Sequence, residues 1–382
     1  MLTLQLSALT LEDFLANYWQ QKPVLIRQGF PGFHDLISPD ELAGLACEAQ
    51  IESRLIYRKA GQWQAESGPF SDYEKYGDKD WTLVVQAVDH WSPDVARLVP
   101  AFSFIPKWRL DDVMVSFAAP GGGVGPHIDL YDVFICQGSG RRRWRVGDRG
   151  NHEQFAAHPA LLHTAPFEAI IDEELQAGDI LYIPPGFPHD GVCLESSMSF
   201  SVGFRSKSAS DMLSGLADYL IDNELGTALI SDPQRPPQYQ QGAINHADMA
   251  MIRAQMQAIL DDQSLIGDFV GSFLSKTKCE LDLQALDDPL EADELREELG
   301  AASLCRTGGL RCFYLETQIS EGICYVDGQR YAFGSALSEV VRSLCDHDVL
   351  DGQTLMSGLQ DIAFMQALTD WVNQGYWYFD EA

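Results

Sequence analysis

The 382-residue sequence has no cysteines in a CxxC spacing and no apolar run of membrane length. A bilayer-spanning helix needs about 18 or more consecutive apolar residues, so we expect no membrane-spanning segment. No apolar run follows a basic region near the first residue, so we also expect no signal peptide. The eight cysteines are scattered. That pattern is typical of a reduced, cytoplasmic protein rather than of a disulfide framework or a zinc site.

Basic residues are also scarce. Lys and Arg number 26 against 56 Asp and Glu, which gives a net charge of −30. Because phosphate binding requires a basic surface, we expect no direct contact with nucleic acid. A strong negative field favours a basic protein partner. Acidity that only serves solubility, or life in a salty habitat, explains the charge equally well.

Residues able to do chemistry concentrate between positions 113 and 206. A glycine-rich run, 120–126, is followed by His127-Ile128-Asp129. Residues two apart on a strand face the same way, so His127 and Asp129 can present an imidazole and a carboxylate side by side. The run lacks the Lys-Ser/Thr of a phosphate loop, and we interpret it as a flexible approach to these two residues. Taken alone, the pair is more typical of two solvated residues on a strand than of a metal site.

His189 is the predicted third member of this set. Residues 180–183 form a short apolar strand, and Pro-Pro-Gly at 184–186 ends it, since proline cannot continue a ladder. We therefore expect His189 to be held at a rigid corner. Two histidines and one carboxylate on one side of a metal form the facial triad of non-haem Fe(II) oxygenases, which leaves coordination positions open.

Arg142 is a candidate for binding an anion. On a strand over 141–146 it shares a face with Trp144 and Val146, and this apolar face should be buried. A buried cation needs an anionic partner. The arginines at 141, 143 and 145 lie on the opposite, solvated face. Ser116 has a mid-strand hydroxyl that can donate to the same anion, although a local hydrogen bond is the alternative.

This region resembles the JmjC-type cupin oxygenases, and in particular the bacterial ribosomal oxygenases. The resemblance covers most of the chain and is carried by four segments, 127–129, 131–134, 138–147 and 178–189. It implies an α+β fold, in which a double-stranded β-helix of the cupin/JmjC type is followed by a helical dimerisation region and a winged-helix-like domain. We expect these three parts at 1–207, 208–280 and 281–382.

The resemblance also implies an activity. Members of this family use Fe(II), 2-oxoglutarate and dioxygen to hydroxylate a protein side chain, and the bacterial members act on the β-carbon of an arginine in large-subunit ribosomal protein sixteen. His127, Asp129 and His189 would be the metal-binding, catalytic residues. Arg142 would hold the distal carboxylate of 2-oxoglutarate in a bidentate manner, together with Ser116.

Partners and alternatives follow from the same resemblance. It implies a basic ribosomal protein as substrate and a homodimer as the assembly. Four carboxylates are candidates, by position, for holding the target arginine: Asp111, Asp112, Asp132 and Asp190. A lysine demethylase with the same triad, or a cupin that binds a ligand without turnover, is the alternative function.

Periodicity predicts the elements around these residues. Strands are expected at 113–118, 131–137, 141–146, 168–174, 180–183 and 198–204. Helices are expected from about 212 to 221, 247 to 260 and 263 to 276. The last hundred residues are expected to form short strands near 310–315, 322–326, 330–333 and 376–379, with helices near 336–345 and 361–374. The histidines at 152, 158 and 163 have no ligand spacing and are predicted to lie on the surface.

Overall fold

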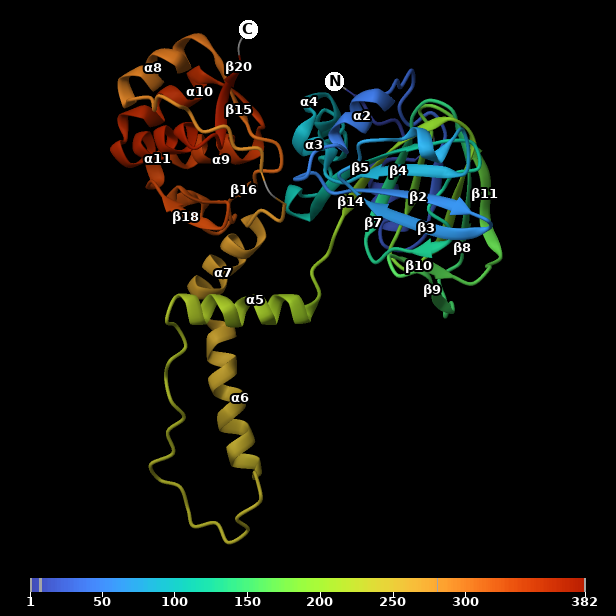
Figure 1. Ribbon diagram of the computed structural model, residues 1–382. Coiled ribbons are helices and arrows are strands. Elements are labelled where there is room, and N and C mark those ends of the chain that lie inside the picture. Colours follow the sequence, from blue (N-terminus) through green and yellow to red (C-terminus); the bar gives the residue numbers. More distant parts are fainter. Residues whose placement is uncertain (1, 7–8, 280, 381–382) are drawn as a thin grey trace. The chain divides into compact units, whose positions relative to one another are not determined.

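A computed structural model of the chain describes residues 2–6, 9–279 and 281–380. The chain divides into two compact units, Met1–Ser206 with Glu280–Asp282, and Lys207–Cys279 with Leu283–Ala382 (Figure 1). The expected boundary at residue 280 lies outside the described residues. None of the helices that the structure describes has the length and apolarity needed to cross a membrane.

Two facing sheets make up the first unit. The larger has eight strands in the order β1-β12-β7-β14-β5-β4-β2-β3. Their bounds are β1 Val24–Ile26, β2 Ser53–Lys59, β3 Gln62–Ser67, β4 Trp81–Val85, β5 Leu110–Ala118, β7 Asp132–Gln137, β12 Ile180–Ile183 and β14 Ser197–Phe204. The smaller sheet has the order β11-β8-β13-β6. Its bounds are β6 His127–Ile128, β8 Arg141–Gly147, β11 Ala169–Leu175 and β13 Pro188–Glu195. This is the expected double-stranded β-helix.

Strand β7 shows how the larger sheet is buried on both sides. All six of its residues are buried. Val133 and Ile135 pack in the apolar cluster between the two sheets, together with Trp144 of β8. Phe134 and Cys136 face the other way, into a larger cluster that includes the N-terminal helices. Because successive strand residues alternate in direction, a continuously apolar strand is what a sheet covered on both faces requires.

Four short helices accompany the larger sheet: α1 Leu11–Asn17, α2 Pro39–Leu45, α3 Val88–Trp91 and α4 Pro93–Ala96. α2 begins with a capping box, in which Ser38 accepts from the backbone N–H of Glu41 and the Glu41 carboxylate accepts from the backbone N–H of Ser38. Such reciprocal bonds satisfy two backbone donors that a helix leaves open. They therefore fix where α2 begins.

The structure corrects two local expectations. His189 lies on strand β13, as its second residue, and not at a corner after β12. The stretch around the histidines at 152, 158 and 163, where no strand was expected, contains a hairpin, β9 Gln154–His158 with β10 Leu161–Thr164. His163 of this hairpin is buried, 2% exposed, and its imidazole bonds the backbone carbonyl of Val124, so the predicted surface location is wrong. The strand that contains His189 pairs with β6 and β8, which are distant in the sequence, so its bounds did not follow from the local pattern.

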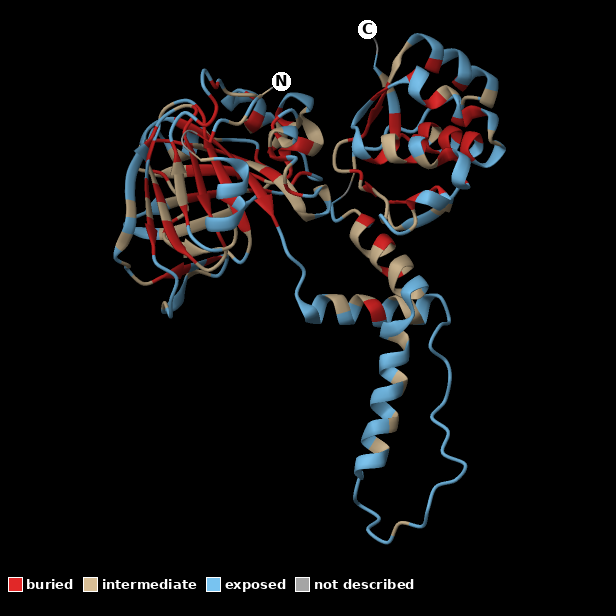
Figure 2. Cartoon of the chain, turned by 180° about the vertical axis from the view of Figure 1, so that it is seen from behind, coloured by how far each residue is buried: buried red, intermediate tan, exposed pale blue. Residues whose placement is uncertain are grey.

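The second unit begins with three helices, α5 Ala209–Asp222, α6 His246–Asp261 and α7 Gln263–Ser275, which confirm the predicted periodicity. α6 and the segment joining it to α5 are almost entirely exposed (Figure 2). The remainder holds two small sheets, β19-β15-β20 and β16-β17-β18. Their bounds are β15 Ser303–Arg306, β16 Cys312–Phe313, β17 Ile323–Val326, β18 Gln329–Ala332, β19 Val349–Asp351 and β20 Trp377–Asp380.

Four helices complete this part: α8 Ala292–Ala301, α9 Ser338–Asp346, α10 Gly352–Met356 and α11 Ile362–Asn373. α9 and α11 fall where helices were predicted. α8 and strand β15 were not predicted. In α8 only Leu295 and Leu299 are buried, and charged residues fill most of the other positions. That apolar stripe is too narrow to stand out from the surrounding acidic run.

Candidate active site

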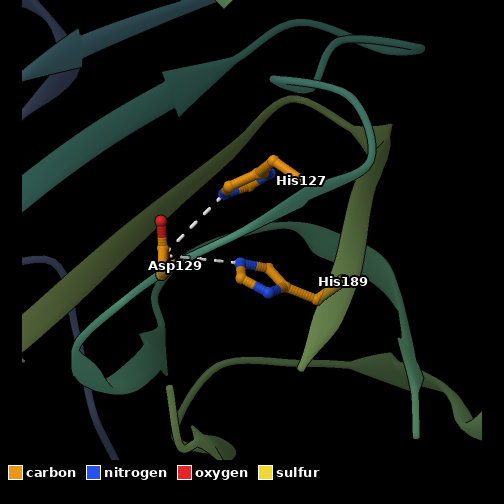
Figure 3. Close-up of side chains that lie close together, drawn as sticks. All are labelled: His127, Asp129 and His189. Carbon is orange, nitrogen blue, oxygen red and sulfur yellow. Dashed lines mark ion pairs between the residues drawn. The ribbon is translucent and has the colours of Figure 1, made fainter. Parts of the chain in front are cut away.

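Three side chains converge between the two sheets. One possible metal-ligand atom from each of His127, Asp129 and His189 lies within 4.8 Å of those of the other two (Figure 3). The Oδ2 atom of Asp129 is 3.8 Å from Nε2 of His127 and 3.6 Å from Nε2 of His189. The two histidines are cross-strand partners on β6 and β13. Asp129 follows β6 directly, so the predicted spacing of two residues places it beside His127.

Backbone carbonyls orient both imidazoles. Nδ1 of His127 donates to the carbonyl of Gly125 at 2.8 Å, and Nδ1 of His189 donates to the carbonyl of Phe187 at 3.0 Å. A carbonyl can only accept, so each Nδ1 carries the proton and each Nε2 keeps its lone pair. Partners of this kind orient the histidine ligands of metal sites. The Nε2 atoms of both histidines therefore lie beside the Asp129 carboxylate, each with a lone pair that can bind a metal ion.

The electrostatic surroundings favour a neutral imidazole at His189. Burial, with the nearby imidazole of His127, lowers the pKa of His189 to about 4, so this ring is unprotonated at neutral pH. Burial also raises the pKa of Tyr131, and the adjacent carboxylate of Asp129 raises it further through its charge and a hydrogen bond. Tyr131 is therefore a neutral hydroxyl that helps to hold this carboxylate.

The glycine-rich run is closely packed. The backbone N–H of Gly121 donates to the carbonyl of Cys193 on β13, and the N–H of Cys193 donates to the carbonyl of Gly122, both at 2.8 Å. A Cβ on Gly122 would collide with the carbonyl of Trp81, and one on Gly123 with that of Gly191. The absence of side chains thus permits close backbone approach. Close packing rather than flexibility explains these glycines.

A cavity of about 230 Å³ opens next to the three side chains. Its lining includes the triad together with Arg142, Trp144 and Ser116. Arg142 is 5% exposed and Trp144 is 7% exposed, which confirms the predicted burial of this strand face. Arg141 and Arg143, on the other face, are exposed and pair with acidic side chains, as predicted.

Arg142 has no acidic partner among the described residues. Its Nε donates to Oγ of Ser197, its Nη1 to Oγ of Ser116, and its Nη2 to the backbone carbonyls of Ser116 and Ser197. Burial lowers its pKa to about 10, so the side chain remains a cation at neutral pH. A buried guanidinium held only by neutral groups is ready for an anion.

These bonds change the expected manner of anion binding. A guanidinium has five N–H donors, and four of those of Arg142 are engaged, which leaves one on Nη1. The expected bidentate contact would therefore require existing bonds to break. Ser116 accepts from Arg142, so its own hydroxyl proton can be donated to the anion. One N–H of Arg142 and the hydroxyl of Ser116 thus make a combined binding site.

Sequence reasoning missed further polar residues in this cavity. The hydroxyls of Ser199 and Thr82 are buried, line the cavity and have no hydrogen-bond partner among the described residues. Ser199, on β14, is the direct cross-strand partner of Ser116, whose hydroxyl accepts from Arg142. Serine and threonine on strands carry no distinctive pattern, so only knowledge of strand order could have identified them. An unpartnered buried hydroxyl is unusual and fits a polar ligand.

The donor set suits the cofactor and cosubstrate expected here. Two imidazole nitrogens and one carboxylate, grouped on one side, are the ligands of non-haem Fe(II) centres. A dicarboxylate that reaches from this group along the cavity finds the Arg142 guanidinium and two serine hydroxyls at the far end. Trp144 stacks over Gly191 between these ends, where a Cβ would collide with the indole. The residues present therefore fit iron with 2-oxoglutarate.

Comparison with known proteins agrees with this geometry. The family models for the JmjC domain and the ROXA-like winged helix match residues 97–212 and 258–378. The Ribosomal protein uL16 3-hydroxylase of Escherichia coli is 43% identical over 96% of this chain and 97% of that protein. The Probable ribosomal oxygenase of Haemophilus influenzae is 32% identical over 96% of both chains.

Solved structures of the Escherichia coli protein YcfD are similar throughout. One matches with a TM-score of 0.94 and 43% identity, covering 99% of this chain and 100% of that chain. Another, described as a ribosomal oxygenase in complex with cobalt and 2-oxoglutarate, matches with a TM-score of 0.91 and 41% identity over the whole of both chains. With such identity across nearly the full length, the chain belongs to the JmjC-domain ribosomal oxygenases.

Proposed function

We propose that this protein is an Fe(II)- and 2-oxoglutarate-dependent hydroxylase that modifies the β-carbon of an arginine in ribosomal protein uL16. The observation that carries the proposal is the convergence of three metal-ligand side chains and an acid-free buried guanidinium on one cavity. The name of the Escherichia coli relative supports uL16 as the substrate. The complex of YcfD with cobalt and 2-oxoglutarate supports the cosubstrate.

Each side chain has a defined part in this proposal. His127, Asp129 and His189 hold the iron, which when bound supplies, with 2-oxoglutarate and dioxygen, the oxidising power to hydroxylate an unactivated carbon. Arg142 and Ser116 hold the distal carboxylate of 2-oxoglutarate. The orienting bonds to the two imidazoles keep the metal-binding nitrogens aimed at one point, so the cosubstrate and the target carbon meet the same centre.

Asp112 is the best supported of the four candidate carboxylates for the target arginine. It lies two residues before Met114 on β5 and therefore shares the face of β5 that lines the cavity. Burial raises the pKa of Asp112 to about 6, and a cationic partner would favour its ionised form. Asp132 faces the opposite side of β7 and accepts from Tyr182, which favours a structural role.

The test is release of succinate from 2-oxoglutarate in the presence of Fe(II) and Escherichia coli uL16. Replacing His127→Ala should lower the rate by at least about a hundredfold, because a catalytic ligand is lost. His34→Ala is the matched control, since this histidine is exposed and lies outside the cavity. Equal rates for wild type and His127→Ala would remove the proposal.

The modified residue is identified separately by tandem mass spectrometry of the treated uL16. One added oxygen on an arginine is the expected product. An added oxygen on another residue would contradict the proposed target residue but would still support hydroxylation as the class of reaction. Release of formaldehyde from a methylated lysine substrate would instead favour the demethylase alternative.

We also propose that the protein is a homodimer that pairs through α5, α6 and the segment between them. Large apolar side chains are exposed there, including Ile221 at 74%, Leu229 at 90% and Met256 at 64%. Extended apolar surface of this kind marks an interface more often than free surface. The double substitution Ile221→Glu with Met256→Glu should yield a monomer in light scattering coupled to gel filtration. An unchanged mass for the variant, or a monomeric wild type, would contradict the proposal.

A ribosomal substrate also favours the cytoplasmic location expected from the scattered cysteines. The eight cysteines are all free thiols in the structure. Unpaired thiols are typical of proteins that work in a reducing compartment.

A further inference from the structure

The cavity extends beyond the part that the cosubstrate uses. The cosubstrate site is built from β6, β8 and β13 on one side and from β5 and β14 on the other. The cavity continues along the larger sheet over β4 and β2, where its lining includes Thr82, Val84 and Gln86, with Arg54 and Ile56. Thr82, Val84 and Gln86 are spaced two residues apart, and so are Arg54 and Ile56. Side chains with this spacing lie on one face of an extended segment. Arg54 and Gln86 of this wall are not among the residues proposed to hold iron or 2-oxoglutarate.

Arg54 is a second cation in the cavity wall, and nothing in the described residues satisfies it. Its Nε atom is buried without a hydrogen-bond partner. No described carboxylate lies within the 4.0 Å that defines an ion pair. The residue is half-buried, so its charge is only partly hydrated. Both carboxylates of 2-oxoglutarate already have binding groups, so Arg54 is available for a different ligand.

Gln86 directly follows β4, and Arg54 lies on the neighbouring strand β2. Arg54 pairs directly with Val84 on β4, which puts Gln86 at the diagonal position, and the backbone N–H of Gln86 donates to Glu52. Diagonal neighbours are about 7–8 Å apart, within reach of long side chains. The Gln86 side chain is half-buried, and an amide both donates and accepts. Together these two residues offer what a peptide main chain requires, donors for its carbonyls and an acceptor for its N–H.

Their position relative to the target site is fixed by a contact. The backbone N–H of Ala87 donates to the Asp112 carboxylate at 3.1 Å, so the end of β4 lies beside the carboxylate proposed to hold the target arginine. Asp112 and Arg54 belong to β5 and β2, and Gln86 directly follows β4, the strand between those two in the sheet. A chain whose arginine reaches Asp112 can therefore pass over Gln86 and Arg54.

We propose that Arg54 and Gln86 form a docking strip for the main chain of the protein substrate, next to the residue that is hydroxylated. This inference rests on the proposed function and deepens it, because it states what sets the register of the substrate. A guanidinium recognises carbonyl oxygens without attracting the basic side chains of the substrate. The strip thus places one residue at the metal by its backbone, while Asp112 selects the side chain.

The test compares variants by binding and by kinetics. The affinity of the metal-free protein for Escherichia coli uL16 is measured by biolayer interferometry. It should fall about tenfold in Arg54→Gln and in Gln86→Leu, because each substitution removes about the binding free energy of one charged or well-formed hydrogen bond. Arg54→Lys should recover part of the loss. Arg97→Gln is the matched control, because it removes the same charge from a side chain that is 74% exposed and remote from the cavity lining.

Kinetics then separate substrate docking from cosubstrate binding. The KM for uL16 should rise about tenfold in Arg54→Gln, whereas the KM for 2-oxoglutarate should change by less than about twofold. A thermal unfolding midpoint within about 2 °C of wild type would exclude a general structural defect. Parallel rises in both KM values would overturn the inference, as would uL16 affinities equal to that of Arg97→Gln.

Failure of the proposed function looks different. Wild-type protein that binds uL16 but forms no succinate would refute the hydroxylase activity, while a weaker affinity of Arg54→Gln would still support the docking strip. Wild-type protein that does not bind uL16 would refute both the substrate and the strip.

Discussion

Two buried arginines, one in each unit, have opposite surroundings. Arg142 lines the cavity and bonds only to serine hydroxyls and backbone carbonyls. Arg306, on β15, pairs with the carboxylate of Asp348 and donates to the carbonyl of Cys345. The pKa of Arg142 is lowered to about 10 by burial. At Arg306 burial acts in the same direction, but the Asp348 carboxylate outweighs it and the pKa is raised.

The difference separates a structural charge from a functional one. A buried ion pair that is closed within the chain has its compensation built in, and losing one member leaves the other exposed to an apolar surrounding. A buried cation without such a partner is already desolvated before any ligand binds. The unfavourable free energy of this desolvation is offset only when an anion enters the cavity. The anionic partner of Arg142 must therefore come from a ligand, whereas that of Arg306 is Asp348 of the same unit.

Replacing Arg142→Met should have the largest effect, and on activity. Truncating one side of a buried charge pair costs about 2–5 kcal/mol, so the KM for 2-oxoglutarate should rise roughly a thousandfold. The free energy of unfolding without ligand should change by no more than about 1 kcal/mol, because the lost hydrogen bonds are offset by removal of an uncompensated cation. Steady-state kinetics and urea denaturation measure the two quantities. A large loss of stability with an unchanged KM would reverse the assignment.

His189 lines the same cavity as Arg142, and burial lowers the pKa of both side chains. Its folded pKa of about 4 lies below the ordinary value of 6.5, so the unfolded chain binds more protons between these values. The free energy of unfolding of the metal-free protein should therefore fall by up to about 3 kcal/mol as the pH drops from 6.5 to 4. His189→Asn should reduce this dependence in urea denaturation at several pH values. An unchanged pH profile in the variant would contradict the prediction.

Arg306→Met should have the smallest effect, and on stability alone. The Asp348 side chain is 50% exposed and can regain water when the pair is lost. The free energy of unfolding should therefore fall by about 2 kcal/mol, less than for a fully buried pair. The KM for 2-oxoglutarate should equal that of wild type. A changed KM would show that the two arginines are not as different as their surroundings indicate.

Local patterns pointed to the three side chains that converge beside the cavity. His127 and Asp129 are recognisable by a spacing of two, and the burial of Arg142 follows from the apolar residues that share its strand face. These inferences need only the alternation of a strand. The terminating prolines before His189 pointed to the right region but to the wrong local structure, because the strand that contains His189 pairs with residues 43 to 62 positions earlier.

The rest of the cavity depends on strand order. Ser199, Thr82 and Arg54 come from β14, β4 and β2, which share one sheet with β5 only because the fold brings distant segments together. No periodicity distinguishes these residues from other polar residues on strands. His163 was misplaced for the same reason, since its burial arises from the contact of the β9–β10 hairpin with the loop at Val124.

The close packing of Gly121, Gly122 and Gly123 limits how this protein can vary. A methyl group on Gly121 would strike the Asp80 carboxylate, and one on either of the other two would strike a carbonyl oxygen of a neighbouring strand. These three positions on the path into β6 therefore admit no side chain. Drift and laboratory evolution can exchange the groups that surround the metal site. A side chain at any of these three glycines, however, would displace the segment that positions His127.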